Sequence, residues 1–502
     1  MSRILRLSVI SILVLLPITP INLAFGQATA TQAPERNIEG KEVRPTSDVS
    51  NQVKKGTAGT NYLRRKTQSD LISFAQPKFA ASFSELQMPA LAPQAHIVFP
   101  TSDRKNRTAA AKVALFLQTE GSQEIRKAQS KAYTHFLVLR TSGAKPHVAG
   151  TLPNGNSPST ILAIYRFPAG GGAGVIAIVD AFNYPNAESD LNVFSKTFGL
   201  PTCTTASGCL KIIKAASDAS LDLSKMQTDC GWSTEAALDL QWAHAIAPNA
   251  KLVFVQANSN NNNDLYAAVA KATDAVVEAG GGQISMSWGS DESDTDANLN
   301  SVFKSGVLYF ASSGDTGGQL EYPAASPAVI SVGGTGFLRD VTGKISPQYG
   351  WTGSGGGVSQ YEPISNVQRN VENTSGNFRN IPDISANADP LSGVAVYVSV
   401  PVTSCVDKPS PDQYQVGWNV IGGTSLATPI IAAMTNVSGK RRSSVTDELQ
   451  AIYGNRQNSS RIFDVTVMDG TAGGNQIKVG YDNVTGVGTP AGPDFDANPT
   501  TP

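Results

Sequence analysis

Short apolar segments alternate with helical patterns between residues 174 and 332, and this alternation constrains the fold more than any other feature of the chain. Each apolar segment is continuous, as strands are when both faces of a sheet are covered. Helical patterns occupy 234–246 and 264–279 between them. We therefore expect an α/β fold with a mostly parallel sheet. The expected strands are 174–180, 251–255, 284–287, 306–311 and 329–332.

The first residues have the pattern of a secretory signal peptide. Arg3 and Arg6 precede an apolar run at 7–16, and small residues suitable for cleavage follow before residue 28. The run is short for a bilayer span, and no later stretch reaches about 18 uninterrupted apolar residues. We expect residues 1–28 to direct export to the periplasm or the extracellular medium, with no membrane partner; a membrane-anchored N-terminus is the alternative.

Charge divides the chain into a basic and an acidic part. Residues 1–150 hold 20 Lys and Arg against 9 Asp and Glu, whereas residues 151–502 hold 19 against 31, giving +11 and −12. A basic stretch can bind nucleic acid or an anionic membrane. Here the acidic part of the same chain is a simpler partner, so we expect no nucleic-acid ligand. A nucleic-acid- or surface-binding leader is the competing interpretation, and it predicts activity in residues 29–150 alone.

Turn-forming residues at 151–158 mark a domain boundary. Before it, a polar stretch at 29–70 precedes a helix-like stretch that starts near residue 109 and a strand at 136–140. We expect a basic prosegment or leader at 29–155, either a small α+β unit or partly disordered. A main domain at 156–492 and a C-terminal tail at 493–502 follow.

A serine lies between a glycine-rich turn and an apolar helix. Gly422 and Gly423 precede Thr424 and Ser425, and apolar residues follow at 430–434. This arrangement predicts a hydroxyl at a helix N-terminus, where backbone N–H groups can stabilise an oxyanion. An ordinary N-cap is the alternative.

No histidine is placed to act as the base for this serine. His244 lies on the expected helix at 234–246, about 180° around it from Glu235. Glu235 and Asp239 are about 40° apart and share a face. A carboxyl pair can share a proton, which raises one pKa and suits a base that works in acid. The other histidines are His96, His135 and His147, all before the boundary.

The alternative for this pair is two exposed acidic residues on a solvated helix. The surrounding residues of the helix are mostly alanine, leucine and tryptophan, which argues against exposure. A third carboxyl group, Asp315, directly follows the expected strand at 306–311, a position where α/β enzymes place functional residues. If it is protonated, it can donate a hydrogen bond to an oxyanion. Otherwise it is a turn residue.

Together these segments resemble the sedolisins, the serine-carboxyl peptidases, which are secreted endopeptidases with a subtilisin-like fold. The resemblance covers about 160–490 and implies a subtilisin-like, doubly wound sheet. It implies Ser425 as nucleophile, Glu235 as base, Asp239 as its partner and Asp315 in the oxyanion hole. The matching motifs are EAALD at 235–239 with APNA at 247–250, SWG at 287–289, SGD at 313–315, IPDISA at 381–386 with ADP at 388–390, GGTS at 422–425, and GYD at 480–482 with TGVGTP at 485–490.

The same resemblance implies an acid-active hydrolase made as a zymogen, which cleaves protein or peptide substrates. Its own prosegment would inhibit it until processing near residue 155. The resemblance also implies one structural calcium ion, and oxygen ligands with two carboxylates suit calcium. A glycine-rich turn without metal is the alternative, and lysine stands at 478 where the family usually has glycine. The implied ligands are Asp464, Val465, Lys478, Gly480 and Asp482.

We expect a monomer. Two further interpretations compete with an active sedolisin. A catalytically inactive relative would use the groove to bind peptides. A conventional subtilisin would use Asp180 and a histidine followed by glycine, and the chain has no His-Gly pair. Cys203 and Cys209 are close enough to close a small loop, leaving Cys230 and Cys405, although four cysteines allow three pairings. Without a CxxC motif, we expect no zinc.

Overall fold

The computed structural model describes residues 95–98, 131–141 and 152–498, except 340–343, 412, 413, 441 and 471. The expected signal peptide, the polar stretch at 29–70 and the helix-like stretch near 109 lie outside these ranges. Within them, no helix is both long enough and apolar enough to cross a bilayer.

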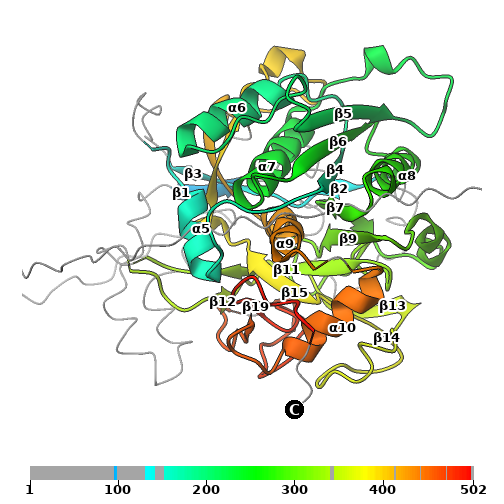
Figure 1. Cartoon of the computed structure of the whole chain (residues 1–502), viewed down its shortest axis with the longest axis vertical. Helices are drawn as coiled ribbons and strands as arrows, with labels where there is room; N and C mark the ends of the chain where they lie inside the picture. The colour runs from blue at the N-terminus through cyan, green and yellow to red at the C-terminus, as the bar shows by residue number, and fades with distance from the viewer. Residues whose placement is uncertain are drawn as a thin grey trace, which may run out of the picture. The chain divides into compact units, whose positions relative to one another are not determined.

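The core is a mostly parallel eight-stranded sheet, so the expected α/β fold is confirmed (Figure 1). Seven strands run in parallel, and β12 pairs antiparallel with β11 at one edge. All five expected strands are present, with ends shifted by a few residues. In spatial order the strands are β12 (Tyr349–Gly350), β11 (Ile330–Gly336), β9 (Val307–Ser312), β7 (Gly282–Met286), β4 (Val175–Ala181), β6 (Lys251–Ala257) and β5 (Leu210–Ala215), while β15 (Ile384–Asn387) also pairs with β11.

Helices cover both faces of this sheet, as a doubly wound sheet requires. Helices α7 (Cys230–Ile246) and α9 (Thr424–Ser438) pack against each other on one face, and α8 (Asn262–Glu278) lies on the other (Figure 1). Every residue of α7 is buried. The smaller helices α5 (Pro158–Tyr165), α6 (Ala187–Phe198) and α10 (Val445–Asn455) lie towards the periphery.

Residues 131–141, which we call the groove segment, form strands with the main domain. Strand β2 (Tyr133–Thr134) pairs with β8 (Trp288–Asp291), which also pairs with β10 (Glu321–Tyr322). Strand β3 (Leu137–Thr141), expected at 136–140, pairs with β17 (Gly417–Gly422). The same sheet includes β1 (Ala95–Val98) and β16 (Val394–Val398). Part of the expected prosegment is thus integrated into the fold.

The remaining strands form two-stranded pairs at the margins. Strand β13 (Gly357–Pro363) pairs with β14 (Phe378–Ile381), and β18 (Ile462–Phe463) with β19 (Thr489–Pro490). Short 3-10 helices lie at Leu223–Lys225, Asp296–Val302, Pro390–Ser392 and Val402–Ser404. The disulfides are Cys203–Cys209 and Cys230–Cys405, one of the three pairings that the sequence allows.

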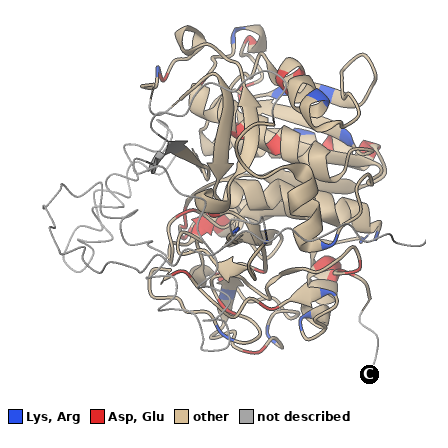
Figure 2. Ribbon diagram, turned by 90° about the vertical axis from the view of Figure 1, so that its left-hand side faces the viewer, with Lys and Arg blue, Asp and Glu red and all other residues tan. Residues whose placement is uncertain are grey.

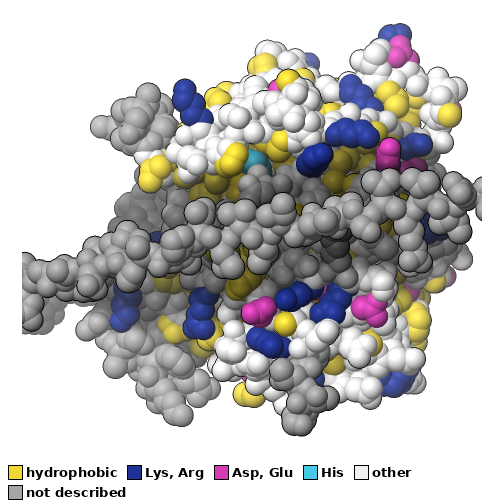
Figure 3. All heavy atoms as spheres, in the orientation of Figure 1, with side chains coloured by type: hydrophobic (Ala, Val, Ile, Leu, Met, Phe, Trp, Pro, Cys, Tyr) yellow, Lys and Arg dark blue, Asp and Glu magenta, His cyan; other side chains and the backbone are white. Residues whose placement is uncertain are grey.

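Charged residues are sparse on the central helices and strands in Figure 2. Many carboxyl groups are nevertheless internal: sixteen Asp and Glu are buried, whereas Arg379 is the buried member of the Lys and Arg residues whose burial the structure describes. The face in Figure 3 carries Lys and Arg side chains as well as acidic ones. The acidic balance of residues 151–502 is therefore not expressed as a uniformly acidic surface on this face.

Candidate active site

Ser425 lies in the first turn of α9, directly after β17, as the sequence predicts. The turn between them requires Gly423, which has φ +102°. A Cβ at this position would lie 2.1 Å from the carbonyl oxygen of His135 and 2.6 Å from Asp315 Oδ2. The glycine therefore lets a bound backbone approach the start of the helix.

The Ser425 hydroxyl donates to a carboxyl group. Its Oγ lies 2.9 Å from Glu235 Oε2 and 3.1 Å from the Ser287 carbonyl oxygen. Glu235 reaches this point from α7 because α7 and α9 pack side by side. Helix α7 begins four residues earlier than predicted, since the Asp229 side chain accepts a hydrogen bond from the Trp232 N–H at 2.9 Å and caps the helix.

Glu235 and Asp239 form the carboxyl pair expected from their spacing, and both are fully buried. Burial raises the pKa of Glu235 well above its usual value, and the neighbouring Asp239 charge adds to this. Burial also raises the pKa of Asp239, whose Oδ1 accepts from Ser287 Oγ at 2.9 Å. Glu235 Oε1 and Asp239 Oδ2 have no hydrogen-bond partner among the described residues. A proton held by this pair would neutralise one of two buried charges.

Asp315 lies just beyond the carboxyl end of β9 and faces the start of α9. Its Oδ1 accepts hydrogen bonds from the Thr424 N–H at 2.7 Å and from Thr424 Oγ1 at 2.8 Å. Its Oδ2 is directed towards Gly423 and the carbonyl oxygen of His135. The structure therefore brings all four residues that the sequence singled out, Ser425, Glu235, Asp239 and Asp315, to one place.

The two histidines whose side chains the structure describes do not present a ring nitrogen to Ser425. His244 Nε2 lies 2.8 Å from the Pro201 carbonyl oxygen, on the other side of α7, and burial lowers its pKa. His135 does reach Ser425, but through its backbone: its N–H lies 3.1 Å from Ser425 Oγ. Its ring points elsewhere, with Nδ1 2.6 Å from Ser312 Oγ. This geometry does not form a serine–histidine–aspartate triad.

Parts of this chain are similar to known proteins. The family model described as "Subtilase family" matches residues 228–457. Kumamolisin from Bacillus sp. (strain MN-32) is 28% identical over 297 residues, covering 51% of this chain and 49% of that protein. Sedolisin from Pseudomonas sp. (strain 101) is 25% identical over 339 residues, covering 61% and 54%. The chain is therefore similar to members of the sedolisin family.

Among solved structures, Pseudomonas sedolisin in complex with pseudo-iodotyrostatin has the same fold. Its TM-score is 0.55 at 23% identity, and the match covers 68% of this chain and 96% of that one. The expected subtilisin-like fold is confirmed. The chain spans about half the length of the two curated relatives it matches.

Among the predicted calcium ligands, Asp464 contacts Gly480, and Asp482 contacts Lys478. Asp464 Oδ2 accepts from the Gly480 N–H at 2.9 Å, and Asp464 Oδ1 is buried without a hydrogen-bond partner among the described residues. Burial raises the pKa of Asp464 and raises that of Asp482 to about 7. An orphaned carboxylate oxygen at Asp464, next to the backbone of the 478–482 loop, fits an oxygen-ligated calcium ion.

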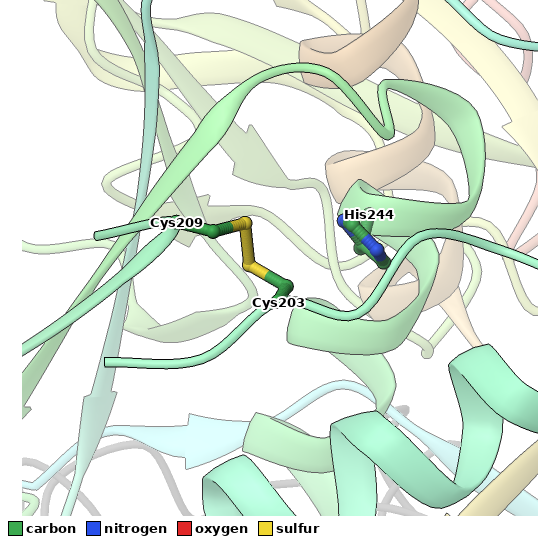
Figure 4. Close-up of side chains that lie close together, drawn as sticks. All are labelled: Cys203, Cys209 and His244. Atoms are coloured by element: carbon green, nitrogen blue, oxygen red, sulfur yellow. A yellow bond between two sulfur atoms is a disulfide. The ribbon is translucent and has the colours of Figure 1, made fainter. Parts of the chain in front are cut away.

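Two groups that combine cysteines with another ligand type do not make metal sites. Figure 4 shows His244 beside Cys203 and Cys209, whose sulfurs are bonded to each other. The second group joins Asp407 to the Cys230–Cys405 disulfide. A disulfide has no thiolate to offer a metal, so neither group supports a zinc site.

Sequence reasoning missed three contributors to the site. Asp180, considered only as the acid of a subtilisin triad, is fully buried, and its charge acts on both Glu235 and Asp239. Ser287 joins Asp239 to the backbone of Ser425, because its Oγ lies 3.3 Å from the Ser425 carbonyl oxygen. His135 enters through strand pairing across more than 280 residues, which no local pattern reveals. The SWG motif at 287–289 indicates Ser287 in the sequence, whereas no sequence pattern indicates His135.

Proposed function

We propose that this chain is an acid-active serine-carboxyl endopeptidase that forms an acyl-enzyme on Ser425. The observation that carries the proposal is the 2.9 Å contact between Ser425 Oγ and Glu235 Oε2, in a fully buried site where the pKa of Glu235 is raised. A carboxylate with a raised pKa is a stronger base than an ordinary glutamate and can activate a hydroxyl.

In the first half of the proposed reaction, Ser425 Oγ attacks the carbonyl carbon of a bound peptide and Glu235 takes the hydroxyl proton. Asp239 lies beside Glu235 and supports the transfer by holding or sharing a proton. The carbonyl oxygen becomes negatively charged. It accepts from the Ser425 N–H, which already bonds the His135 carbonyl oxygen at 3.0 Å, and from protonated Asp315. Glu235 then gives its proton to the leaving amine, and the acyl-enzyme remains.

In the second half, Glu235 takes a proton from water as the water attacks the acyl carbon. Collapse of this intermediate breaks the bond to Ser425 Oγ and returns the proton to it. The product is a free carboxyl group. Both halves need Glu235 able to accept a proton and Asp315 able to donate one, and it is the need for a protonated Asp315 that favours acid conditions.

The precursor form belongs to the same proposal. Residues 1–28 direct export, and residues 29–155 inhibit the enzyme until they are removed. The groove segment supports an inhibitory role because it occupies the position beside Ser425. Processing near residue 155 is supported by the exposure of Leu152, 68% of whose surface is accessible. Removal of residues 1–28 and 29–155 would then yield a main domain at 156–492.

A structural calcium ion completes the proposal. Asp464 and Asp482 would provide carboxylate oxygens, and carbonyl oxygens of Val465, Lys478 and Gly480 would add to them. When bound, calcium would neutralise two buried carboxylates and hold the 478–482 loop against the strand that ends at Phe463.

The Ser425→Ala variant tests the peptidase. We expect the purified variant to keep the circular dichroism spectrum of the wild type, to remain unprocessed at pH about 4 and to leave peptides intact, because the nucleophile is lost. Wild-type protein should process itself under the same conditions. A variant that is processed normally in pure form would remove Ser425 from the mechanism, and a wild type without any hydrolysis would favour an inactive peptide-binding relative.

A further inference from the structure

Glu372 lies against the loop at 478–482 and is not one of the calcium ligands that the family resemblance implies. Its carboxylate is next to Gly480: a Cβ on Gly480 would lie 2.7 Å from Glu372 Oε1 and 3.3 Å from Glu372 Cδ. Gly480 has φ +83°, a conformation that glycine adopts readily. The missing side chain at position 480 therefore leaves room for a carboxylate beside the loop.

The turn that carries Glu372 is attached to the same loop by the next residue. Asn373 Nδ2 donates to the Val479 carbonyl oxygen at 2.9 Å. Thr374 Oγ1 donates to the Val371 carbonyl oxygen at 2.7 Å, and Val371 is buried, so the turn itself is anchored in the fold. The backbone thus places Glu372 beside the loop, and its position does not depend on the side chain alone.

Arg456, directly after α10, holds one oxygen of the Glu372 carboxylate. Arg456 Nε lies 2.5 Å from Glu372 Oε2, and Arg456 Nη1 donates to the Tyr453 carbonyl oxygen at 2.7 Å. Glu372 Oε1 accepts no hydrogen bond from the described residues. One oxygen is therefore paired with a cation, and the other remains available next to Gly480.

Asp464 presents a second available oxygen at the same glycine. Its Oδ2 accepts from the Gly480 N–H at 2.9 Å, while its Oδ1 is buried without a partner among the described residues. Burial raises the pKa of Asp464, and the charge of Glu372 raises it further, so the two carboxyl groups lie within electrostatic reach of each other. Two like charges around one glycine are stabilised when a cation lies between them.

The charge balance fits a divalent ion when Glu372 is included. Asp464, Asp482 and Glu372 carry three negative charges when they are ionised, and Arg456 offsets one of them, which leaves two. One calcium ion neutralises these two charges. Without Glu372, the same arginine would leave only one negative charge for the ion.

A cavity of about 830 Å³ adjoins these groups, and its lining includes Glu372, Asp464 and Gly480. The side chain of Glu372 is 36% exposed. An ion can therefore reach both carboxylates from solvent, and such an entry path is a requirement for a metal site.

We propose that Glu372 is a further ligand of the calcium ion and supplies Oε1 as a third carboxylate oxygen, while Arg456 orients it. This inference rests on the proposed calcium site and adds a residue to it. The resemblance implies five ligand residues, Asp464, Val465, Lys478, Gly480 and Asp482, whereas calcium takes about six to eight oxygen ligands. The coordination shell therefore has a place for Glu372.

Terbium luminescence distinguishes a ligand from a nearby charge, because Tb³⁺ binds at calcium sites and its lifetimes in H₂O and D₂O count the water molecules bound to the ion. The parent protein is the full-length Ser425→Ala variant, which prevents self-cleavage. Glu372→Ala should increase the water count by about one, since water replaces the lost oxygen. Glu372→Asp keeps the charge and a partner for Arg456 but is one methylene shorter, and it should show the same increase. Asp464→Ala should remove the signal, which assigns the bound Tb³⁺ to this site.

Calcium titration calorimetry of the same metal-free proteins measures the affinity. Glu372→Ala should raise the Kd at least about tenfold. Glu278→Ala, at the exposed end of α8, is the matched control and should keep the parent's Kd.

Three results would overturn the inference, and each has a different meaning for the calcium site. An unchanged Kd and water count in Glu372→Ala, with binding still lost in Asp464→Ala, rejects Glu372 and leaves the site standing. A raised Kd with an unchanged water count shows that Glu372 acts through its charge and is not a ligand. Absence of calcium binding by the parent rejects the site and the inference together, and it leaves the proposed peptidase mechanism untouched.

Discussion

Asp180 carries a fully buried carboxyl group at the end of β4, beside the Glu235–Asp239 pair. Neither of its oxygens has a hydrogen-bond partner among the described residues, and burial raises its pKa to about 8. In the unfolded chain its pKa is about 4. Since the folded state holds this proton more tightly, Asp180 favours folding below pH about 4, and its contribution is lost as the pH rises to about 8.

We therefore expect Asp180→Asn to flatten the pH dependence of stability. The free energy of unfolding of the wild type should fall between pH 4 and pH 8, and the variant should show a smaller fall because the amide does not titrate. Urea unfolding at several pH values measures this difference. Asp274→Asn, on the exposed face of α8, provides the matched control and should follow the wild type.

In the proposed mechanism, Asp315 would set the pH dependence of the reaction. Raising the pH removes the proton that Asp315 needs as a donor and the proton shared by Glu235 and Asp239, so hydrolysis should peak in acid and fall towards neutrality. Asp315→Asn keeps a donor without a titrating proton. Its residual activity should extend further towards neutral pH, although most of the rate is lost. A wild-type optimum at or above pH about 7.5 would contradict the carboxyl mechanism.

At the scale of elements, the Cys230–Cys405 disulfide anchors the first residue of α7, the helix that carries Glu235. It closes a loop of 175 residues, whereas Cys203–Cys209 closes one of 6. A longer loop removes more entropy from the unfolded chain, about 5 kcal/mol against about 2 kcal/mol. Replacing Cys230 and Cys405 by alanine should therefore lower the melting temperature more than replacing the other pair. Equal decreases in melting temperature for the two double variants would contradict this entropic account.

The stability of the loop at 478–482 and of strand β18 should depend on calcium. If Asp464 and Asp482 bind the ion, a strong chelator should lower the melting temperature, since a ligand bound only by the folded state stabilises it. Asp464→Asn should reduce the response to chelator, and Asp494→Asn, a surface change, should leave it intact. An unchanged wild-type melt, with no calcium by elemental analysis, would remove the site.

Local patterns predicted most of the elements that position the site. Strands such as β4 and helices such as α7 consist largely of apolar residues, and this pattern is visible in the sequence itself. The sequence pattern predicts the start of α7 too late, because the capping residue Asp229 precedes the apolar pattern. The pairing of β3 with β17 depends on residues nearly 300 positions apart, so the position of His135 required the structure.

At the scale of the whole molecule, the interior is rich in acid groups and poor in bases. Burial raises the pKa of Asp496 to about 6, of Asp482 to about 7 and of Asp180 to about 8. Arg379, paired with Asp383, is the buried cation of the described part. The buried acidic residues are Asp180, Asp190, Asp229, Glu235, Asp239, Asp264, Asp296, Asp315, Glu321, Glu362, Asp383, Asp389, Glu448, Asp469, Asp482 and Asp496.

The whole protein should accordingly be more stable in mild acid than near neutrality. Groups with raised pKa bind protons on folding, so the free energy of unfolding falls as the pH rises from about 4 through the values of 6 to 8. Melting temperatures measured with chelator between pH 4 and pH 8 should decrease over this range. A melting temperature that is highest at pH 8 would show that these carboxyl groups are paired with cations or solvated.

The groove segment and the site that it occupies belong to one polypeptide, and in the proposed precursor this linkage would set the kinetics of activation. A tethered occupant has an effective concentration of about millimolar, fixed by the chain rather than by the amount of protein in solution. Dilution therefore does not empty the groove, and a free peptide of the same sequence competes poorly until the tether is cut. Activation should follow a first-order time course, with the same half-time for nanomolar and micromolar precursor. The half-time of the proposed activation would then depend on the pH and not on how far the precursor is diluted.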